Sequence, residues 1–182
     1  MTNTADVERI ARPAPADYGP FYDGYISEVA GEDPVAAMAS QLSTTGAMLA
    51  TVDAQSAGHR YAPGKWSIGE VVGHLADTER IMAYRALALA RGETAHLPGF
   101  DENAYVATAG FEGRTLESLV HEWQSVRRST IALFSGFGPG AIAGSGAVNG
   151  GPMSVRALAY IIPGHEAHHV RVLRERYGVG RP

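Results

Sequence analysis

The sequence predicts an all-α domain built on four long helices. Apolar residues recur at intervals of three and four in four separate stretches, which is the pattern of amphipathic helices. Helix-capping residues stand at the start of these stretches. The chain has 182 residues, of which 45% are hydrophobic, so it can bury one substantial core but not two ordinary ones. We expect a single domain over residues 33–182 and an N-terminal arm over residues 1–32 that packs against it.

The N-terminal part of the chain leads into the first helix. Residues 1–16 are polar and end in a proline-rich run, so we expect an extended arm. Asp33 and Pro34 then supply an N-cap and a first-turn proline, which predict a helix that continues to about Val52. A cluster of mostly aromatic residues between the two is expected to pack the arm onto the domain: Tyr18, Phe21, Tyr22, Tyr25 and Ile26.

The second helix contains a candidate metal ligand. Ser67 and Glu70 have the spacing of a capping box, and the helix is expected to end at Arg91, where a glycine follows a basic last turn. His74 lies in the first turns of this helix among apolar neighbours. Such a histidine is commonly a core or edge residue, but it becomes a candidate ligand when a metal site elsewhere lacks a partner.

The connections and the third helix carry less information about function. The linker over residues 92–114 contains Asp101, which can cap a short helix. The third long helix is expected over residues 115–134, and its His121 has no histidine at helical spacing, so we interpret it as a surface residue. The glycine-rich residues 135–153 lack a P-loop motif and favour a small hairpin around an Asn-Gly turn.

The fourth helix, predicted over Ser154–Tyr177, carries the residues with the clearest chemistry. His165 and His169 are one turn apart and therefore project from the same side of the helix. Two imidazoles held in this way supply half of a transition-metal site, and a third ligand must come from elsewhere in the fold. Pro163 removes an amide donor directly before this pair, so we expect a kink there.

Other interpretations of these histidines stay open. Three histidines within five residues also occur on solvated helix faces, and the spacing alone is only moderately specific. His168 could be a ligand, a neighbour of the ligands or a surface residue, and we favour the last two. His165 to His169 also match the HExxH pattern of zinc peptidases, in which the glutamate is the general base. Those enzymes usually place their third ligand downstream, whereas no histidine follows His169.

Composition and charge argue against several other classes of function. The net charge is −4 with scattered Lys and Arg, so we expect no nucleic-acid-binding or membrane-binding face. The N-terminus lacks the pattern of a signal peptide, and no apolar run reaches the roughly 18 residues of a membrane helix, so we expect a cytoplasmic protein. The chain has no cysteine, which excludes disulfides, thiolate ligands and a cysteine nucleophile.

Three segments resemble the DinB-like superfamily, also described as DinB/YfiT-like metalloenzymes. They are YAPGKWSIGEVVGHLADTER (61–80), LPGFDENAYV (97–106) and ALAYIIPGHEAHHVRVLRERY (157–177). The resemblance implies an antiparallel four-helix bundle with up-down-down-up connectivity and a long crossover between the second and third helices. It also implies one divalent metal ion held by His74, His165 and His169, for which we expect zinc or nickel ahead of iron or manganese.

We expect a metal-dependent enzyme that acts on a small molecule. Members of the family with known activities include thiol S-transferases that use bacillithiol and isomerases that use mycothiol. The resemblance therefore implies transfer of a low-molecular-weight thiol co-substrate, with hydrolysis as the other reaction open to such a site. In either case Asp77 or Glu166 could orient a ligand or act as general base. The alternatives are a non-catalytic metal-binding stress-response protein and, less favoured, the zinc peptidase; a homodimer is compatible with the architecture.

Overall fold

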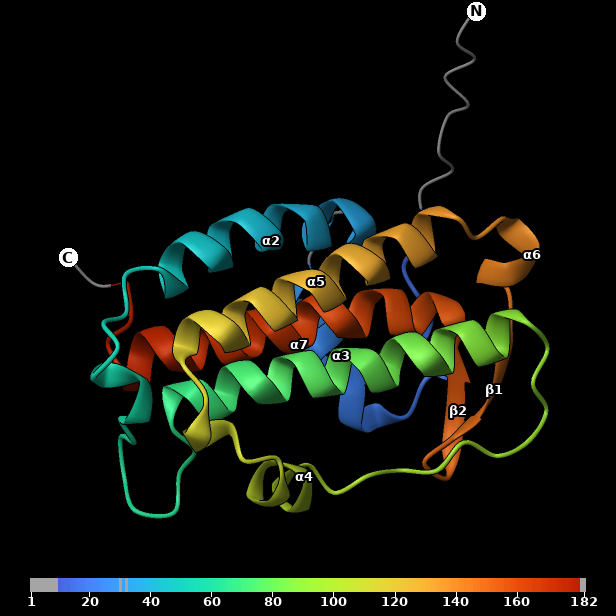
Figure 1. The fold of residues 1–182 in the computed structure, drawn as a ribbon. Helices are drawn as coiled ribbons and strands as arrows, with labels where there is room; N and C mark the ends of the chain where they lie inside the picture. The colour runs from blue at the N-terminus through green and yellow to red at the C-terminus, as the bar shows by residue number, and fades with distance from the viewer. Residues whose placement is uncertain (1–9, 30, 32, 181–182) are drawn as a thin grey trace, which may run out of the picture.

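The structure, a computed structural model, describes residues 10–29, 31 and 33–180. It is mostly helical, as the sequence predicts. The four long helices are α2 (Pro34–Leu49), α3 (Ile68–Ala90), α5 (Leu116–Ser135) and α7 (Val155–Arg176). They form the body of the molecule in Figure 1, and their bounds lie within a few residues of the predicted ones. In the described ranges no helix combines the length and the apolar composition that a membrane crossing requires.

The predicted helix caps are present. Ser67 Oγ accepts a hydrogen bond from the Glu70 amide at 3.2 Å, and the Glu70 carboxylate accepts one from the Ser67 amide at 2.6 Å. This completes the capping box at the start of α3. Asp33, Thr115 and Ser154 each accept a hydrogen bond from an amide in the first turn of their own helix. Local sequence signals therefore fix where the four long helices begin.

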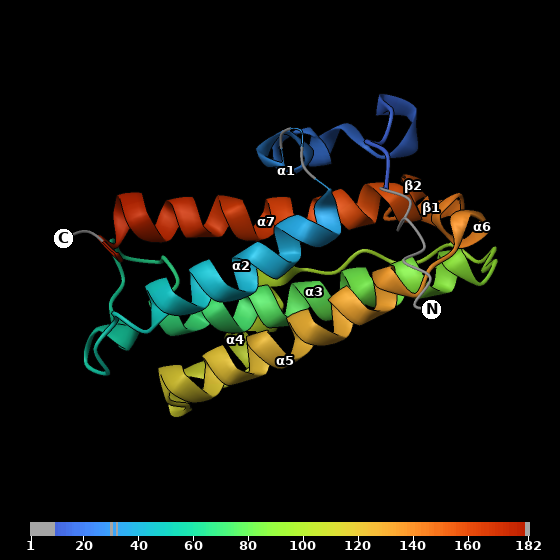
Figure 2. The same cartoon turned by 90° about the horizontal axis from the view of Figure 1, so that it is seen from above.

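Each long helix packs against two of the others. α3 contacts α5 and α7, and α2 contacts the same two helices, as the view from above in Figure 2 shows. The colour order in Figure 1 shows that α2 and α7 run in one direction, and α3 and α5 in the other. The connection from α3 to α5 must therefore return along the length of the molecule. It carries the short helix α4 (Glu102–Thr108) and the 3-10 turn η4 (Phe111–Gly113).

The segment before α2 is folded onto α7. It forms the 3-10 turns η1 (Pro15–Asp17) and η2 (Pro20–Tyr22) and the helix α1 (Asp23–Glu28), which packs against α7. Of the residues expected to anchor this segment, Tyr18, Tyr22 and Ile26 are buried, whereas Phe21 is 75% exposed. Residues 1–9 of the expected extended arm lie outside the described residues, and the chain is helical from Pro15. The division into an arm and a domain stays a prediction.

The predicted hairpin between α5 and α7 is confirmed. Strands β1 (Ser145–Val148) and β2 (Gly151–Ser154) pair antiparallel, and Asn149 and Gly150 connect them. Both turn residues have positive φ, 50° and 78°, as a two-residue type I′ turn requires. Two further short elements complete the chain, the 3-10 turn η3 (Ser56–Gly58) and the helix α6 (Pro139–Ile142).

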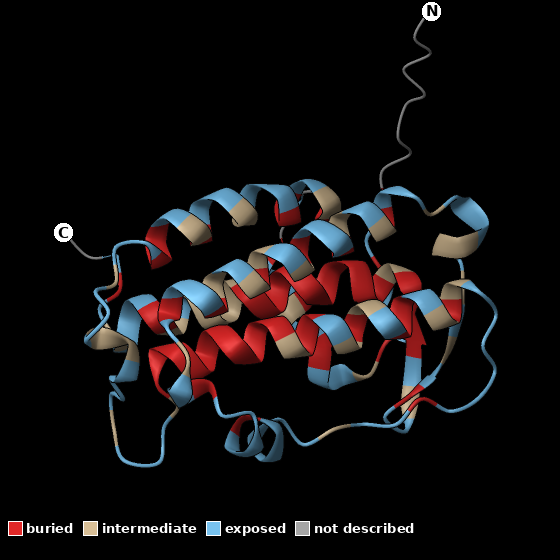
Figure 3. Cartoon of the chain, viewed as in Figure 1, coloured by how far each residue is buried: buried red, intermediate tan, exposed pale blue. Residues whose placement is uncertain are grey.

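The core lies between the long helices. Figure 3 shows that burial is concentrated along the N-terminal halves of α7 and α3. Trp123 on α5 and the α7 residues Leu158 and Ile161 are fully buried. Burial of such large apolar side chains is the main stabilising contribution to a bundle of this size.

α7 continues through Pro163, where the sequence predicts a kink. The helix extends without interruption from Val155 to Arg176. Gln41 Nε2 on α2 donates a hydrogen bond to the Pro163 carbonyl oxygen at 2.8 Å. The next residue, Gly164, faces the backbone of α1, and a Cβ atom added there would overlap the carbonyl oxygen of Tyr25. Glycine therefore allows the close approach of α1 to α7.

We expect Gly164→Ala to force α1 away from α7. Overpacking against backbone should lower the free energy of unfolding by about 1–3 kcal/mol. Urea denaturation measures the change. The matched control is Gly24→Ala, since Gly24 lies in α1 with no atom within 4 Å of an added Cβ, and this variant should be neutral or slightly stabilised. Equal stability of Gly164→Ala and wild type would contradict the close packing of the two helices.

Candidate metal centre

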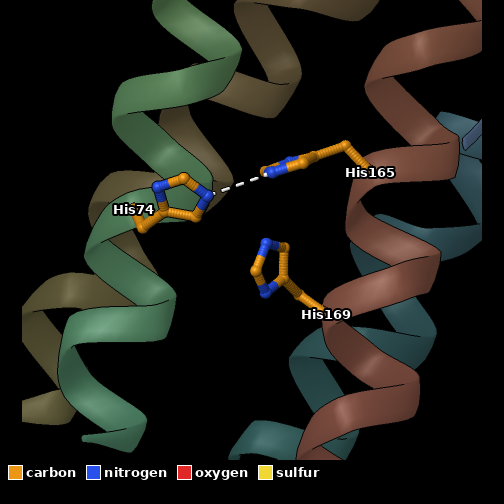
Figure 4. A group of neighbouring side chains, drawn as sticks. All are labelled: His74, His165 and His169. Carbon is orange, nitrogen blue, oxygen red and sulfur yellow. Dashed lines mark hydrogen bonds between the residues drawn. The ribbon is translucent and has the colours of Figure 1, made fainter. Parts of the chain in front are cut away.

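The structure brings together the three histidines that the sequence singles out. His74 comes from α3, and His165 and His169 come from consecutive turns of α7. One ring nitrogen of each lies within 4.8 Å of the others. His74 Nε2 and His165 Nε2 are 3.0 Å apart, as drawn in Figure 4. Imidazole nitrogens bound tetrahedrally to one ion at about 2.0–2.1 Å are roughly 3.3 Å apart, so the His74–His165 pair has about the spacing of two ligands of one ion, with His169 beside them.

Neighbouring side chains hold the imidazole of His74 in place. Thr78 Oγ1, one turn farther along α3, lies 3.3 Å from His74 Nδ1. This contact leaves Nε2 directed at the other two histidines. Trp66, just before the N-cap of α3, packs its ring against that of His74 at a centroid distance of 4.6 Å. The capping box at the start of α3 therefore also positions the aromatic wall of the site.

Helix α1 covers the other side of the cluster. The Tyr25 ring makes edge contacts with the rings of His165 and His168, at centroid distances of 5.3 and 5.6 Å. His168 itself is partly buried, and its Nδ1 lies 3.4 Å from Arg171 Nη2. His121 is exposed on α5, as expected for a surface residue. Tyr25, which covers this side of the site, was predicted only as an anchor of the arm.

Burial keeps the three imidazoles neutral. Loss of hydration lowers the pKa of His74 from 6.5 to about 4. Burial and the neighbouring imidazoles lower the pKa of His169 to about 3 and that of His165 well below its usual range. Neutral imidazole is the form that binds a metal ion, so three donors are available at pH 7. The donor set fits zinc, nickel or another divalent transition metal of similar softness.

The histidine cluster opens into a cavity of about 380 Å³. A cavity of this size accommodates a small-molecule ligand. Its walls combine aromatic and polar side chains and come from η2, α1, α3 and the residue before its N-cap, the start of α4 with the segment before it, the hairpin turn and α7. The lining residues are Phe21, Tyr22, Tyr25, Trp66, His74, Thr78, Met82, Arg85, Gly99, Phe100, Glu102, Asn149, Ile161, His165, His168 and His169. Structural zinc sites are usually closed by four protein ligands, whereas three histidines beside a cavity leave positions for a substrate.

The two carboxylates proposed from the sequence as orienting or basic groups do not line this cavity. Asp77 forms an ion pair with Arg80 at 3.3 Å, and burial raises its pKa. Glu166 is fully buried and accepts a hydrogen bond from Thr45 Oγ1 at 2.6 Å. It also pairs with Arg127, whose Nη2 lies 2.6 Å from Glu166 Oε2. A catalytic role for either carboxylate stays a prediction, and their contacts favour structural support.

The buried ion-pair network behind His165 was not predicted from the sequence. Arg127 on α5 is 1% exposed and contacts Glu79 of α3 with both Nε and Nη2, at 2.8 to 3.0 Å. Its Nη1 donates to Gln41 Oε1 of α2 at 2.9 Å. One signal was available, because Arg127 occupies the same helix face as the apolar residues Trp123 and Phe134. A charged residue on the core face of an amphipathic helix indicates a buried partner.

The fold and the site together define a helical bundle in which three histidines beside a cavity could hold a metal ion. The family model of the DinB superfamily matches residues 38–173, and the chain therefore belongs to this superfamily. A comparison with curated proteins finds no match.

The fold also resembles a solved structure. YfiT from Bacillus subtilis superimposes with a TM-score of 0.64 and 16% sequence identity, over 93% of this chain and 95% of that protein. YfiT is described as a probable metal-dependent hydrolase with an unusual four-helix bundle topology. At this identity the similarity establishes the shared fold.

The depressed pKa of His74 predicts that the metal-free protein loses stability as the pH falls. Between pH 6.5 and about 4 the unfolded chain binds a proton at this residue and the folded chain does not. The residue should therefore contribute a slope of up to about 1.4 kcal/mol per pH unit to the free energy of unfolding. Urea denaturation of chelator-treated protein at several pH values measures this slope.

The comparison variants are His74→Ala, in which the slope should become shallower, and His121→Ala, in which it should not change. His121 is the matched histidine because it is exposed on α5. An unchanged slope in His74→Ala would mean that the folded protein accepts the proton and that the imidazole is not held neutral by burial.

Proposed function

We propose that this chain is a divalent-metal-dependent hydrolase of small molecules, with the metal held by His74, His165 and His169. The observation that carries the proposal is the convergence of three neutral imidazoles at the wall of a cavity of about 380 Å³. Membership of the DinB superfamily and the fold shared with YfiT support the same class of function. Zinc and nickel are the ions we expect first, with iron or manganese as alternatives.

A divalent ion held by three imidazoles supplies Lewis acidity, which polarises a substrate oxygen and lowers the pKa of a water molecule. The protein's own contribution is to position ligands and shape the cavity. Thr78 directs His74 Nε2 toward the site. The rings of Trp66 and Tyr25 flank the histidines and limit the access of bulk water. Arg127 binds Glu166, the residue after His165, and so fixes the turn of α7 that presents the ligand.

Transfer of a low-molecular-weight thiol is the second candidate reaction. A metal ion that acidifies water also acidifies a thiol, so the same site serves both reactions. The chain contains no cysteine, and a thiol nucleophile would therefore enter as a co-substrate such as bacillithiol or mycothiol. The cavity beside the histidines has room for such a molecule together with a small acceptor.

The geometry gives less support to the other interpretations. An HExxH peptidase needs its glutamate at the metal as general base, whereas Glu166 is fully buried against Thr45 and Arg127. A purely structural metal would be enclosed by protein ligands, whereas this cluster lines a cavity.

The test is turnover by zinc- or nickel-loaded protein of a panel of chromogenic esters, amides and phosphoesters, with and without a low-molecular-weight thiol. We expect hydrolysis that falls at least 100-fold in His169→Ala and is unchanged in His121→Ala, because only the first residue faces the cavity. A product that carries the thiol would identify the transfer reaction instead. Turnover that survives in His169→Ala, or after complete removal of the metal, would contradict the proposal.

A further inference from the structure

One face of α3 forms a continuous wall of the cavity. His74, Thr78, Met82 and Arg85 follow one another at intervals of four, four and three residues, and all four line the cavity. His74 and Arg85 are eleven residues apart, so their Cα atoms are separated by about 16 Å along the helix. Helical side chains lean toward the N-terminus, which tilts Arg85 back toward the histidines. The cavity therefore has a histidine end and an arginine end.

Arg85 is a buried cation without a carboxylate partner. Its side chain is 3% exposed. Nη2 donates to the Pro98 carbonyl oxygen at 2.7 Å, Nη1 lies 3.5 Å from the Met82 sulfur, and the guanidinium stands 5.7 Å from the Phe100 ring centroid. The Tyr22 side chain also interacts with the guanidinium, but its hydroxyl is a neutral partner. Among the described residues no carboxylate forms an ion pair with it. Glu102 also lines the cavity, but it is exposed and makes no ion pair with Arg85.

Arg127 provides an internal comparison. It is buried to a similar extent, yet it binds two carboxylates, those of Glu79 and Glu166. Buried charges in proteins are normally paired, because an isolated charge loses its hydration without compensation. Arg127 follows this rule within the chain, whereas Arg85 lines a cavity large enough for a ligand and is paired with no carboxylate of the described residues. A negatively charged group on a ligand in this cavity would balance the charge of Arg85.

We propose that Arg85 binds a carboxylate group of the substrate, while the opposite end of the same molecule reaches the three histidines. The apolar part between the two ends would pack against the aromatic walls, and the span is on the order of 10 Å. Guanidinium groups bind carboxylates in a bidentate manner. A singly charged carboxylate fits better than a phosphate dianion, because Pro98 already occupies one of the donors of Arg85. The statement that the other end of the molecule reacts at the histidines rests on the proposed function. The carboxylate site at Arg85 does not depend on it.

The test is calorimetric titration of metal-free protein with 4-phenylbutanoate and with its neutral amide. Metal-free protein is used because a carboxylate would otherwise also bind the metal, and zinc-loaded protein is titrated in parallel. We expect wild type to bind the carboxylate at least 10-fold more tightly than the amide. Arg85→Met should remove this preference and leave the affinity for the amide within about threefold. Arg85→Lys should retain part of the preference.

The matched control is Arg91→Met. Arg91 follows α3 and stacks on Phe137, at 5.7 Å from the ring centroid, and it does not line the cavity. It should keep the wild-type preference. Because Arg85 has no carboxylate to leave unpaired, Arg85→Met should also keep the wild-type melting temperature or raise it.

The proposal is overturned if wild type shows no preference for the carboxylate, or if Arg85→Met weakens both ligands equally. A lowered melting temperature in Arg85→Met with an unchanged preference would likewise assign Arg85 a purely structural role. Failure of the protein to bind zinc or to turn over a substrate would contradict the proposed function. The titrations of metal-free protein would still test the carboxylate site at Arg85.

Discussion

The ion-pair network centred on Arg127 is the interaction on which the arrangement of the bundle depends. From α5 this side chain reaches Glu79 on α3, Glu166 on α7 and Gln41 on α2, so one buried guanidinium contacts all three other long helices. Loss of one partner of such a buried pair typically costs about 3–5 kcal/mol, because the remaining charge stays unpaired. The network lies directly behind His165. It therefore fixes the separation of α3 and α7, from which the histidine ligands come.

The two buried arginines have different surroundings, and only those of Arg85 suit a ligand. Arg127 is satisfied by carboxylates of the chain, whereas Arg85 faces the cavity with backbone and aromatic neighbours. With a divalent ion at the histidines, both ends of the cavity would carry positive charge, and the lining between and around them contains aromatic rings and one exposed carboxylate, that of Glu102. Such a site favours an anionic molecule with an apolar middle over a neutral or cationic one.

Much of the fold and part of the site could be predicted from local sequence patterns. Capping residues and apolar periodicity located the long helices, and the spacing of His165 and His169 placed them on one side of α7. His74 needed the added requirement of a third ligand. Contacts between distant residues could not be derived, since Arg127 and Glu79 are 48 positions apart. The same limit explains why the sequence could not show that Glu166, proposed to orient a ligand or act as general base, is buried against Arg127, and why the covering role of Tyr25 was missed.

The central claim is that three histidines from two helices hold one metal ion beside an open cavity. Elemental analysis of the zinc-reconstituted protein tests it most directly, with wild type beside His74→Ala, His165→Ala and His169→Ala, and with His168→Ala as control. We expect about one zinc ion per chain in wild type and in the control, and little or none in the other three variants. Wild-type protein without zinc, or a loss of zinc confined to His168→Ala, would contradict it.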